Sequence, residues 1–213
     1  MPTKLIIVRH GQSQANVEKI YAAHLNTPLS SLGREQAARL GEYLKDTPID
    51  AIYSSDLQRA HDTAAPTAKN HNLPIIDSKA LREIDGGEWE GKNFEDLLRE
   101  YPEEYGLWLS DIGKSRTVGG ESVAQVSERM MSELSRIAAL HPEQTVLIAT
   151  HALALRTVCT IASGLPIERM KEIPFVSNAS ISTFLYEDGK LKVLTMDETA
   201  HLEGIESSLP KNV

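Results

Sequence analysis

Residues 5–8 form the sequence feature that most constrains the fold. The run Leu-Ile-Ile-Val is continuous, apolar and rich in β-branched side chains, a pattern typical of a strand buried on both faces of a parallel sheet. Its carboxyl end delivers Arg9-His10-Gly11. Two further apolar runs end in the same way: residues 51–53 precede Ser54-Ser55-Asp56, and residues 145–149 precede Thr150-His151. Three predicted strands therefore end in polar residues.

Helical patterns separate these strands. Apolar residues at helical spacing predict helices over about residues 31–44, 55–70, 123–137 and 152–163. Ser55 and Gln58 match the spacing of a capping box at the start of the second helix. Because strands and helices alternate, the expected fold class is α/β, a three-layer sandwich with a mostly parallel central sheet flanked by helices.

The second half of the chain predicts two additions to this sandwich. Residues 181–186 and 191–196 flank an Asp-Gly turn and predict antiparallel strands near the C-terminus. Residues 87–118 carry five aromatic side chains among many charges without a strand pattern, and we expect a helical flap over the active site. The last residues, about 207–213, are expected to be loose.

Composition excludes several classes of partner and compartment. The net charge of −8 disfavours nucleic acid as a partner. No stretch approaches the ~18 apolar residues of a membrane helix, so no membrane partner is expected. Cys159 is the only cysteine in the sequence, which rules out an intrachain disulfide and a cysteine-based metal site. These features predict a cytoplasmic protein.

The polar residues at the strand ends predict a phosphate pocket. Ligands of open α/β sheets bind beyond the carboxyl ends of the strands, where His10, the turn 54–59 and His151 are expected. Helix N-termini suit an oxyanion, and Arg9 and Arg59 carry the planar donors that clamp phosphate. A neutral imidazole is a competent nucleophile near neutral pH. Either His10 or His151 could serve as the nucleophile.

Four blocks of residues give the chain a family resemblance. In chain order they are Arg9-His10-Gly11 with Asn16, Ser54-Ser55-Asp56-Leu57 with Arg59-Ala60 and Thr63-Ala64, Leu81-Arg82-Glu83-Ile84 with Gly87, Trp89-Glu90-Gly91, and Thr150-His151. In this order and spacing the blocks resemble the histidine phosphatase (phosphoglycerate-mutase-like) superfamily, and among its members the broad-specificity phosphatase branch. The resemblance implies a single histidine phosphatase domain over residues 1–213, with a helical insertion at about 87–118.

The resemblance also implies a role for each site residue. His10 is expected to be the phosphorylated nucleophile, with Arg9, Arg59 and His151 holding the phosphoryl oxygens and Asn16 adding a neutral donor. Glu83 is expected to protonate the leaving oxygen and later to take a proton from water. No cofactor and no metal are implied, because arginine and histidine supply the positive charge. The expected partner is a small phosphorylated metabolite, and a homodimer is left open.

The sequence departs from the family pattern at two places. The residue after the last catalytic histidine is usually glycine in the family and is Ala152 here. The segment Ala22-Ala23-His24-Leu25 stands where relatives often carry Gly or Gln. The other five histidines receive no support from the four blocks and are interpreted as ordinary residues, and the aromatic residues Trp89, Tyr105 and Trp108 as packing residues.

The expected activity is hydrolysis of phosphomonoesters through a phosphohistidine on His10. Two alternatives are kept. One is a phosphoglycerate-type mutase, which moves phosphate between hydroxyls; the block 81–91 and the short chain favour a phosphatase. The other is a non-catalytic module that binds phosphorylated ligands, against which the retention of all the polar site residues argues.

Overall fold

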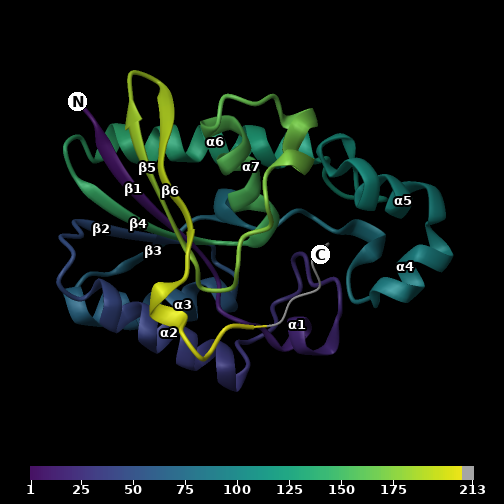
Figure 1. Ribbon diagram of the computed structural model, residues 1–213, viewed down its shortest axis with the longest axis horizontal. Helices are drawn as coiled ribbons and strands as arrows, with labels where there is room; N and C mark the ends of the chain where they lie inside the picture. Colours follow the sequence, from purple (N-terminus) through teal and green to yellow (C-terminus); the bar gives the residue numbers. More distant parts are fainter. Residues whose placement is uncertain (208–213) are drawn as a thin grey trace.

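A computed structural model describes residues 1–207 of the chain (Figure 1). Of the predicted loose tail, residues 208–213 lie outside the described residues. The strands are β1 (Thr3–Arg9), β2 (Ala51–Ser54), β3 (Ile75–Asp77), β4 (Thr145–Thr150), β5 (Ile181–Glu187) and β6 (Lys190–Glu198). The α-helices are α1 (Gln14–Glu18), α2 (Ser31–Leu44), α3 (Gln58–His71), α4 (Phe94–Glu100), α5 (Pro102–Asp111), α6 (Val123–Leu140) and α7 (Ala152–Ala162).

The six strands form one sheet in the order β3-β2-β4-β1-β5-β6. Strands β3, β2, β4 and β1 pair in parallel, while β5 pairs antiparallel with both β1 and β6. The predicted α/β class, with a mostly parallel sheet and antiparallel strands near the C-terminus, is confirmed. In this order β1, β4 and β2 are neighbours, so their carboxyl ends meet at one edge of the sheet.

Helices cover both faces of the sheet (Figure 1). Alternate side chains of β1 point to opposite faces: Leu5 and Ile7 pack in the core with α6 and α7, and Ile6 and Val8 pack in the core with α2 and α3. Because both faces are buried, the strand needs a continuous apolar run rather than an alternating one. The apolar run of residues 5–8 thus divides its side chains between two cores.

The aromatic segment 87–118 is helical where it is regular. It contains α4 and α5, which lie together at one end of the molecule in Figure 1. Trp89 is completely buried there, with its ring against those of Tyr21, Tyr105 and Trp108 at centroid distances of 5.5–5.6 Å. Among residues 1–207, no helix has the length and apolarity needed to cross a membrane.

Two local features differ from the sequence prediction. The predicted capping box at Ser55 and Gln58 is wrong: α3 begins at Gln58 after Leu57, and Leu57 makes no side-chain cap. The Ser55 hydroxyl instead accepts from Leu57 N at 3.3 Å and contacts a histidine of the candidate site. Strand β3 was not predicted, because its three residues are partly exposed at an edge and carry no buried apolar pattern.

Candidate active site

The loop after β1 is held in place by a close backbone approach. A Cβ on Gly33, in α2, would lie 2.0 Å from the carbonyl oxygen of Gln12, and a Cβ on Gly11 would lie 2.7 Å from that of Gly33. Gly11 N also donates to the Thr63 hydroxyl of α3 at 3.0 Å, and His10 N donates to the carbonyl of Thr150 at 2.9 Å. The loop that carries His10 is therefore fixed to β4, α2 and α3.

The hydrogen bonds of the His10 ring define which nitrogen carries the proton. Nδ1 lies 2.7 Å from the carbonyl oxygen of Gly11, which can only accept, so Nδ1 is the donor. Arg59 Nε–H donates to Nε2 at 3.3 Å, which is consistent with a lone pair on Nε2. Burial, joined by the positive charges of Arg59 and Arg9, holds the pKa of His10 well below its usual value. His10 is therefore a neutral imidazole at pH 7, with the lone pair of Nε2 toward Arg59.

Two buried arginines flank His10. Arg9 NH1 donates to the carbonyl of Val176 at 2.6 Å, and Arg59 donates to the carbonyls of Ala23 and Leu25 at 2.7 Å each. Burial lowers the pKa of each guanidinium to about 10, so both stay charged at neutral pH. Within residues 1–207, their hydrogen-bond partners are carbonyls and the His10 ring rather than carboxylates, and Arg9 Nε is buried without a partner. Two guanidinium groups that keep unpartnered N–H donors among the described residues suit the binding of an oxyanion.

His151 lies behind His10, and Ser55 orients it. The two imidazole rings meet edge to face at a centroid distance of 5.1 Å. The Ser55 hydroxyl accepts from Leu57 N, so it can donate its own proton to His151 Nε2 at 2.8 Å. Nδ1 is then the donor nitrogen, and it is buried with no hydrogen-bond partner among the described residues. Burial, followed by Arg59 and His10, holds the pKa of His151 well below its usual value.

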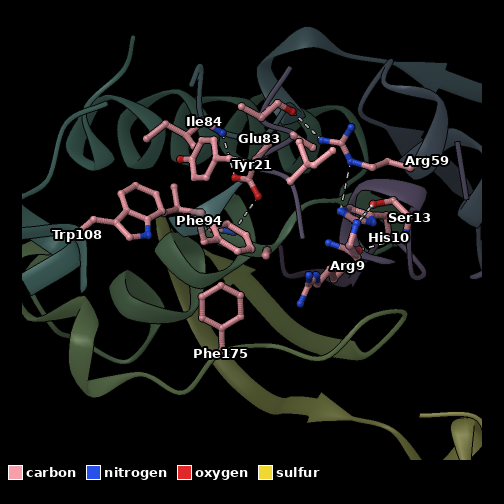
Figure 2. Close-up of a pocket in the computed structure, with 16 residues that line it drawn as sticks. Arg9, His10, Ser13, Tyr21, Arg59, Glu83, Ile84, Phe94, Trp108 and Phe175 are labelled. Atoms are coloured by element: carbon pink, nitrogen blue, oxygen red, sulfur yellow. Dashed lines mark hydrogen bonds between the residues drawn. The ribbon is translucent and has the colours of Figure 1, made fainter. Parts of the chain in front are cut away.

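The Glu83 carboxylate lies at the N-terminus of α7. Oε2 accepts from Leu153 N at 3.1 Å, and Oε1 accepts from Ala154 N at 3.3 Å and from Ile84 N at 3.0 Å. The Leu153 and Ala154 amides belong to the first turn of α7, where amides have no partner within the helix. In Figure 2, Glu83 lies between the cluster of Arg59, Arg9 and His10 and the aromatic side chains Phe94 and Trp108.

Asn16 is oriented by its own helix cap. Its Oδ1 accepts from Ser13 N at 3.0 Å as part of a capping box on α1, and from the Asn178 side chain at 3.4 Å. Because Oδ1 is occupied, the Nδ2 hydrogens of Asn16 can serve a ligand. Asn178 also donates to the carbonyl of His10 at 3.0 Å, which ties the segment before β5 to the same loop.

One pocket brings most of the predicted site residues together (Figure 2). Arg9, His10, Asn16, Arg59 and Glu83 all line it. His151 is completely buried and does not line the pocket; it reaches the site through its contact with His10. Ala152, the departure from the family pattern, is the first residue of α7 and adopts helical backbone, so glycine's freedom at positive φ is not needed there.

Several residues of the site escaped the sequence analysis. Ser13, Ile20, Phe94 and Phe175 line the pocket, but as single serine or apolar residues they match no motif. Ile84 also lines it; it belongs to the third family block but had no predicted role. Trp108, interpreted as a packing residue, also lines the pocket. The role of Ser55 depends on a contact across 96 positions of sequence, for which the sequence gives no signal.

A group that could hold a metal ion lies beside the pocket. Ligand atoms of His24, Asp85 and Glu90 lie within 4.8 Å of one another, the one such group among residues 1–207. The predicted site residues are not members of this group. His24 Nε2 contacts the carbonyl of Glu83 at 2.9 Å, so the group adjoins the segment that carries the predicted acid.

Comparisons with known proteins agree on one family. Residues 5–199 match the sequence profile of the histidine phosphatase superfamily (branch 1). Phosphoserine phosphatase 1 of Hydrogenobacter thermophilus is 33% identical over 199 residues, which cover 93% of this chain and 94% of that protein. Adenosylcobalamin/alpha-ribazole phosphatase of Escherichia coli is 31% identical over 78% of this chain and 82% of that protein. The solved structure of Bacillus stearothermophilus YhfR is similar with a TM-score of 0.90 at 28% identity, covering 94% of this chain and 99% of that one.

Proposed function

This chain belongs to branch 1 of the histidine phosphatase superfamily and is a phosphatase, and we propose that it hydrolyses small phosphorylated metabolites through a phosphohistidine on His10. The observation that carries the proposal is the His10 ring. Its Nδ1 proton is held by the Gly11 carbonyl, so the lone pair on Nε2 faces Arg59 in a pocket that Arg9 also lines. A neutral, oriented imidazole beside an anion site has the features of a nucleophile for phosphoryl transfer.

The phosphoryl group is held by donors that surround His10. Arg9 and Arg59 supply charge, Asn16 supplies its amide hydrogens, and His151 supplies Nδ1–H. The buried, unpartnered Nδ1 of His151 and Nε of Arg9 support this assignment, because a buried donor without an acceptor costs free energy that a phosphoryl oxygen would recover. No metal ion is required, since these groups neutralise the oxygens.

In the first step, His10 Nε2 attacks phosphorus in line with the leaving oxygen. The Nε2–P bond forms, the P–O bond to the alcohol breaks, and Glu83 gives its proton to the leaving oxygen. The phosphorylated ring becomes cationic and retains Nδ1–H. The Gly11 carbonyl already accepts this hydrogen at 2.7 Å, so it stabilises the positive charge as that charge develops.

In the second step, water attacks phosphorus and restores the enzyme. The Glu83 carboxylate takes a proton from the water, the bond between phosphorus and the water oxygen forms, and the Nε2–P bond breaks with its electron pair returning to Nε2. Glu83 ends protonated, as it began. The mutase alternative requires that a second anionic group be held away from the reacting phosphorus. The cationic lining residues are grouped at the His10 end, which supports hydrolysis.

We further propose that residues 1–213 act as a single domain, with residues 87–118 as a flap over the site. Phe94 and Trp108 support this role, since they bring that segment into the pocket wall. A cytoplasmic location is supported by the lone, buried Cys159, because proteins of oxidising compartments commonly use paired cysteines.

The test is trapping of the intermediate. With p-nitrophenyl phosphate as substrate, wild-type protein quenched in base should carry acid-labile phosphate on His10, identified by peptide mass spectrometry. His10→Ala should lose turnover and labelling while remaining folded. His61→Ala, a partly exposed histidine on α3 whose Nε2 lies 3.9 Å from Asp77, is the matched control and should retain both turnover and labelling. Turnover near wild-type in His10→Ala, or phosphate on another residue, would refute the mechanism.

A further inference from the structure

Residues 22–25, one of the two departures from the family pattern, bring a histidine beside the wall of the pocket. Ala23 lines the pocket with a backbone φ of 41°, a left-handed conformation that is uncommon for residues other than glycine. The carbonyls of Ala23 and Leu25, on either side of His24, each accept from Arg59 at 2.7 Å. The backbone around His24 therefore anchors Arg59, whereas the His24 ring has no role in the proposed mechanism.

The His24 ring presents Nδ1 as an available ligand atom. Its Nε2 lies 2.9 Å from the carbonyl oxygen of Glu83, which can only accept, so Nε2 carries the hydrogen. In the neutral ring the lone pair is then on Nδ1, and no residue that the structure describes donates to it. A carbonyl that holds the far N–H is the usual means by which proteins orient a histidine toward a metal ion.

Asp85 and Glu90 each keep one carboxylate oxygen available in the same way. Asp85 Oδ1 accepts from Gly87 N at 3.0 Å. Glu90 Oε1 accepts from His24 N at 3.0 Å and from Gly86 N at 3.4 Å. Within the described part of the chain, no hydrogen bond occupies Asp85 Oδ2 or Glu90 Oε2. Backbone amides thus orient both side chains through one oxygen and leave the other oxygen to a ligand.

We define the His24 group as His24, Asp85 and Glu90. Its ligand atoms lie within 4.8 Å of one another, and all three side chains are half-buried. Around a tetrahedral zinc ion, ligand atoms at about 2.1 Å from the metal are about 3.4 Å apart, so small side-chain rotations bring the group to bonding distance. Arg129, which donates to the same Glu83 carbonyl as His24, is already paired with Glu121 at 2.8 Å. Its charge is therefore directed to Glu121 rather than to the group.

The donor atoms of the His24 group select among cations. One imidazole nitrogen with two carboxylate oxygens suits Zn²⁺ and related divalent transition ions. Ca²⁺ and Mg²⁺ take oxygen ligands and gain little from an imidazole. Three protein ligands leave a further coordination position to water.

We propose that the His24 group binds one divalent ion of the zinc class. The ion cross-links two segments of the pocket wall: residues 22–25, whose carbonyls anchor Arg59, and residues 83–90, which begin with Glu83. Its role is to hold these segments together and to stabilise the fold, because the groups that face the phosphoryl oxygens in the proposed mechanism are not its ligands. The inference does not depend on that mechanism, since ion binding requires no phosphoryl transfer.

The first experiment measures zinc binding to the metal-free full-length protein. Calorimetric titration with zinc chloride, in a buffer without phosphate, should show one ion bound per chain. At a zinc concentration about 100-fold above Kd, the melting temperature should rise by about 5 °C or more, because the ion binds the folded protein. Magnesium chloride should produce neither effect. An unchanged melting temperature in zinc, or equal binding of magnesium, would overturn the proposal.

Three variants test whether the ion lies at the His24 group. His24→Ala should weaken zinc binding by about 100-fold or more, since loss of even a residue that only supports a ligand costs about 10–100-fold. Glu90→Gln keeps an oxygen that can accept from His24 N but removes the charge, and it should weaken binding by about 10-fold or more. His61→Ala, which removes another histidine beside a carboxylate, that of Asp77, is the matched control and should bind zinc as the wild type does. Wild-type affinity in His24→Ala or in Glu90→Gln would place the ion elsewhere and overturn the proposal.

Single-turnover labelling of His10 separates this inference from the proposed function. With p-nitrophenyl phosphate, metal-free and zinc-loaded protein should form phosphohistidine at the same rate, because the ion does not activate the reacting groups. Phosphohistidine in a protein that binds no zinc would overturn this inference alone. One bound zinc with no phosphohistidine in either form would overturn the proposed function alone. Labelling that requires zinc would overturn the stabilising role of the ion and the metal-free mechanism together.

Discussion

At the scale of single residues, the site depends on which nitrogen of each imidazole carries a proton. The Gly11 carbonyl sets the tautomer of His10, and the Ser55 hydroxyl, when it donates to Nε2, leaves the proton of His151 on Nδ1. In the proposed mechanism both partners act on the nitrogen that faces away from the phosphoryl group, so the other nitrogen is presented in the form the chemistry needs: a lone pair on His10 and a donor on His151.

Removal of the Ser55 hydroxyl should therefore damage catalysis more than stability. In Ser55→Ala the tautomer of His151 is no longer fixed, and kcat/KM should fall roughly 10-fold or more, with weaker inhibition by inorganic phosphate. The free energy of unfolding should fall by only about 1 kcal/mol, the typical value of one hydrogen bond. Ser127→Ala, a buried serine on α6 away from the pocket, is the control. Unchanged phosphate inhibition in Ser55→Ala would show that the serine only packs.

Glu83→Gln should distinguish substrates by their leaving groups. An alkyl phosphate needs a proton on the departing oxygen, whereas p-nitrophenolate leaves unaided. Single-turnover phosphorylation of His10 should slow about 100-fold with 2-phenylethyl phosphate and change little with p-nitrophenyl phosphate. Arg59→Lys should slow both alike, because the phosphoryl group is common to them. Equal slowing of both substrates in Glu83→Gln would assign Glu83 to binding, and Asp85 or Glu121 would be the next candidate acid.

The sequence predicted the polar residues of the site better than the apolar ones. Arg9, His10 and Arg59 occupy short motifs at strand ends, and topology alone brings such ends together. Phe94 and Phe175 come from segments remote in sequence, and any apolar side chain of similar size would fit the same pattern. Their placement depends on tertiary packing, which local sequence does not encode.

At the scale of elements, regular structure was predictable where a face is buried. The run in β1 and the stripe on α6 both reflect burial against the sheet. Strand β3 escaped because it is short and partly exposed. The capping box at Ser55 failed because α3 begins only at Gln58, and the Ser55 hydroxyl accepts from Leu57 N instead. Such a short side-chain-to-backbone bond competes with a helix cap.

Gly33 gives a prediction at the scale of elements, because the close approach of α2 to the loop after β1 requires a residue without a side chain. In an ordinary helix interior Gly→Ala stabilises by up to about 1 kcal/mol. A Cβ on Gly33, however, would lie 2.0 Å from the Gln12 carbonyl, so Gly33→Ala must push α2 away from the loop carrying His10. We expect lower melting temperature and lower kcat/KM.

The matched control is Gly106→Ala in α5, where a Cβ meets nothing within 4 Å. This variant should be as stable as wild type or more so, with unchanged kinetics. Thermal denaturation followed by circular dichroism, together with kcat/KM for p-nitrophenyl phosphate, compares the two. Equal melting temperatures in Gly33→Ala and wild type would show that the loop yields without cost.

At the scale of the whole molecule, the role of metal ions can be tested by removing them. EDTA treatment should leave kcat/KM unchanged, because in the proposed mechanism Arg9 and Arg59 neutralise the phosphoryl oxygens and His151 donates to them. His24→Ala removes one member of the group that could hold an ion and serves as a second probe. Two results together would assign the reaction to metal-assisted chemistry. EDTA would remove activity that magnesium or zinc restores, and His24→Ala would abolish activity.

Stability against pH is also a property of the whole fold. Burial holds the pKa of His10 and of His151 well below the value of 6.5 that each regains on unfolding. Below pH 6.5 the unfolded chain therefore binds protons that the folded protein does not. Because the slope of unfolding free energy with pH follows the excess of protons in the unfolded state, stability falls as pH falls. Each histidine contributes up to about 1.4 kcal/mol per pH unit.

Urea denaturation at pH 7, 6 and 5 measures this contribution. The free energy of unfolding of the wild type should decrease with acidification, and the decrease should be smaller in His151→Gln by up to about 1.4 kcal/mol per pH unit, since one titrating group has been removed. Phosphate must be excluded from the buffers, because an anion that binds the folded protein adds stability of its own. Added phosphate should then stabilise the wild type more than an Arg9→Gln variant, which lacks one of the charges that attract it. Parallel pH profiles for wild type and His151→Gln would mean that the buried ring accepts a proton as readily in the folded as in the unfolded protein. That result would contradict the neutral imidazole that the proposed donor role of His151 requires.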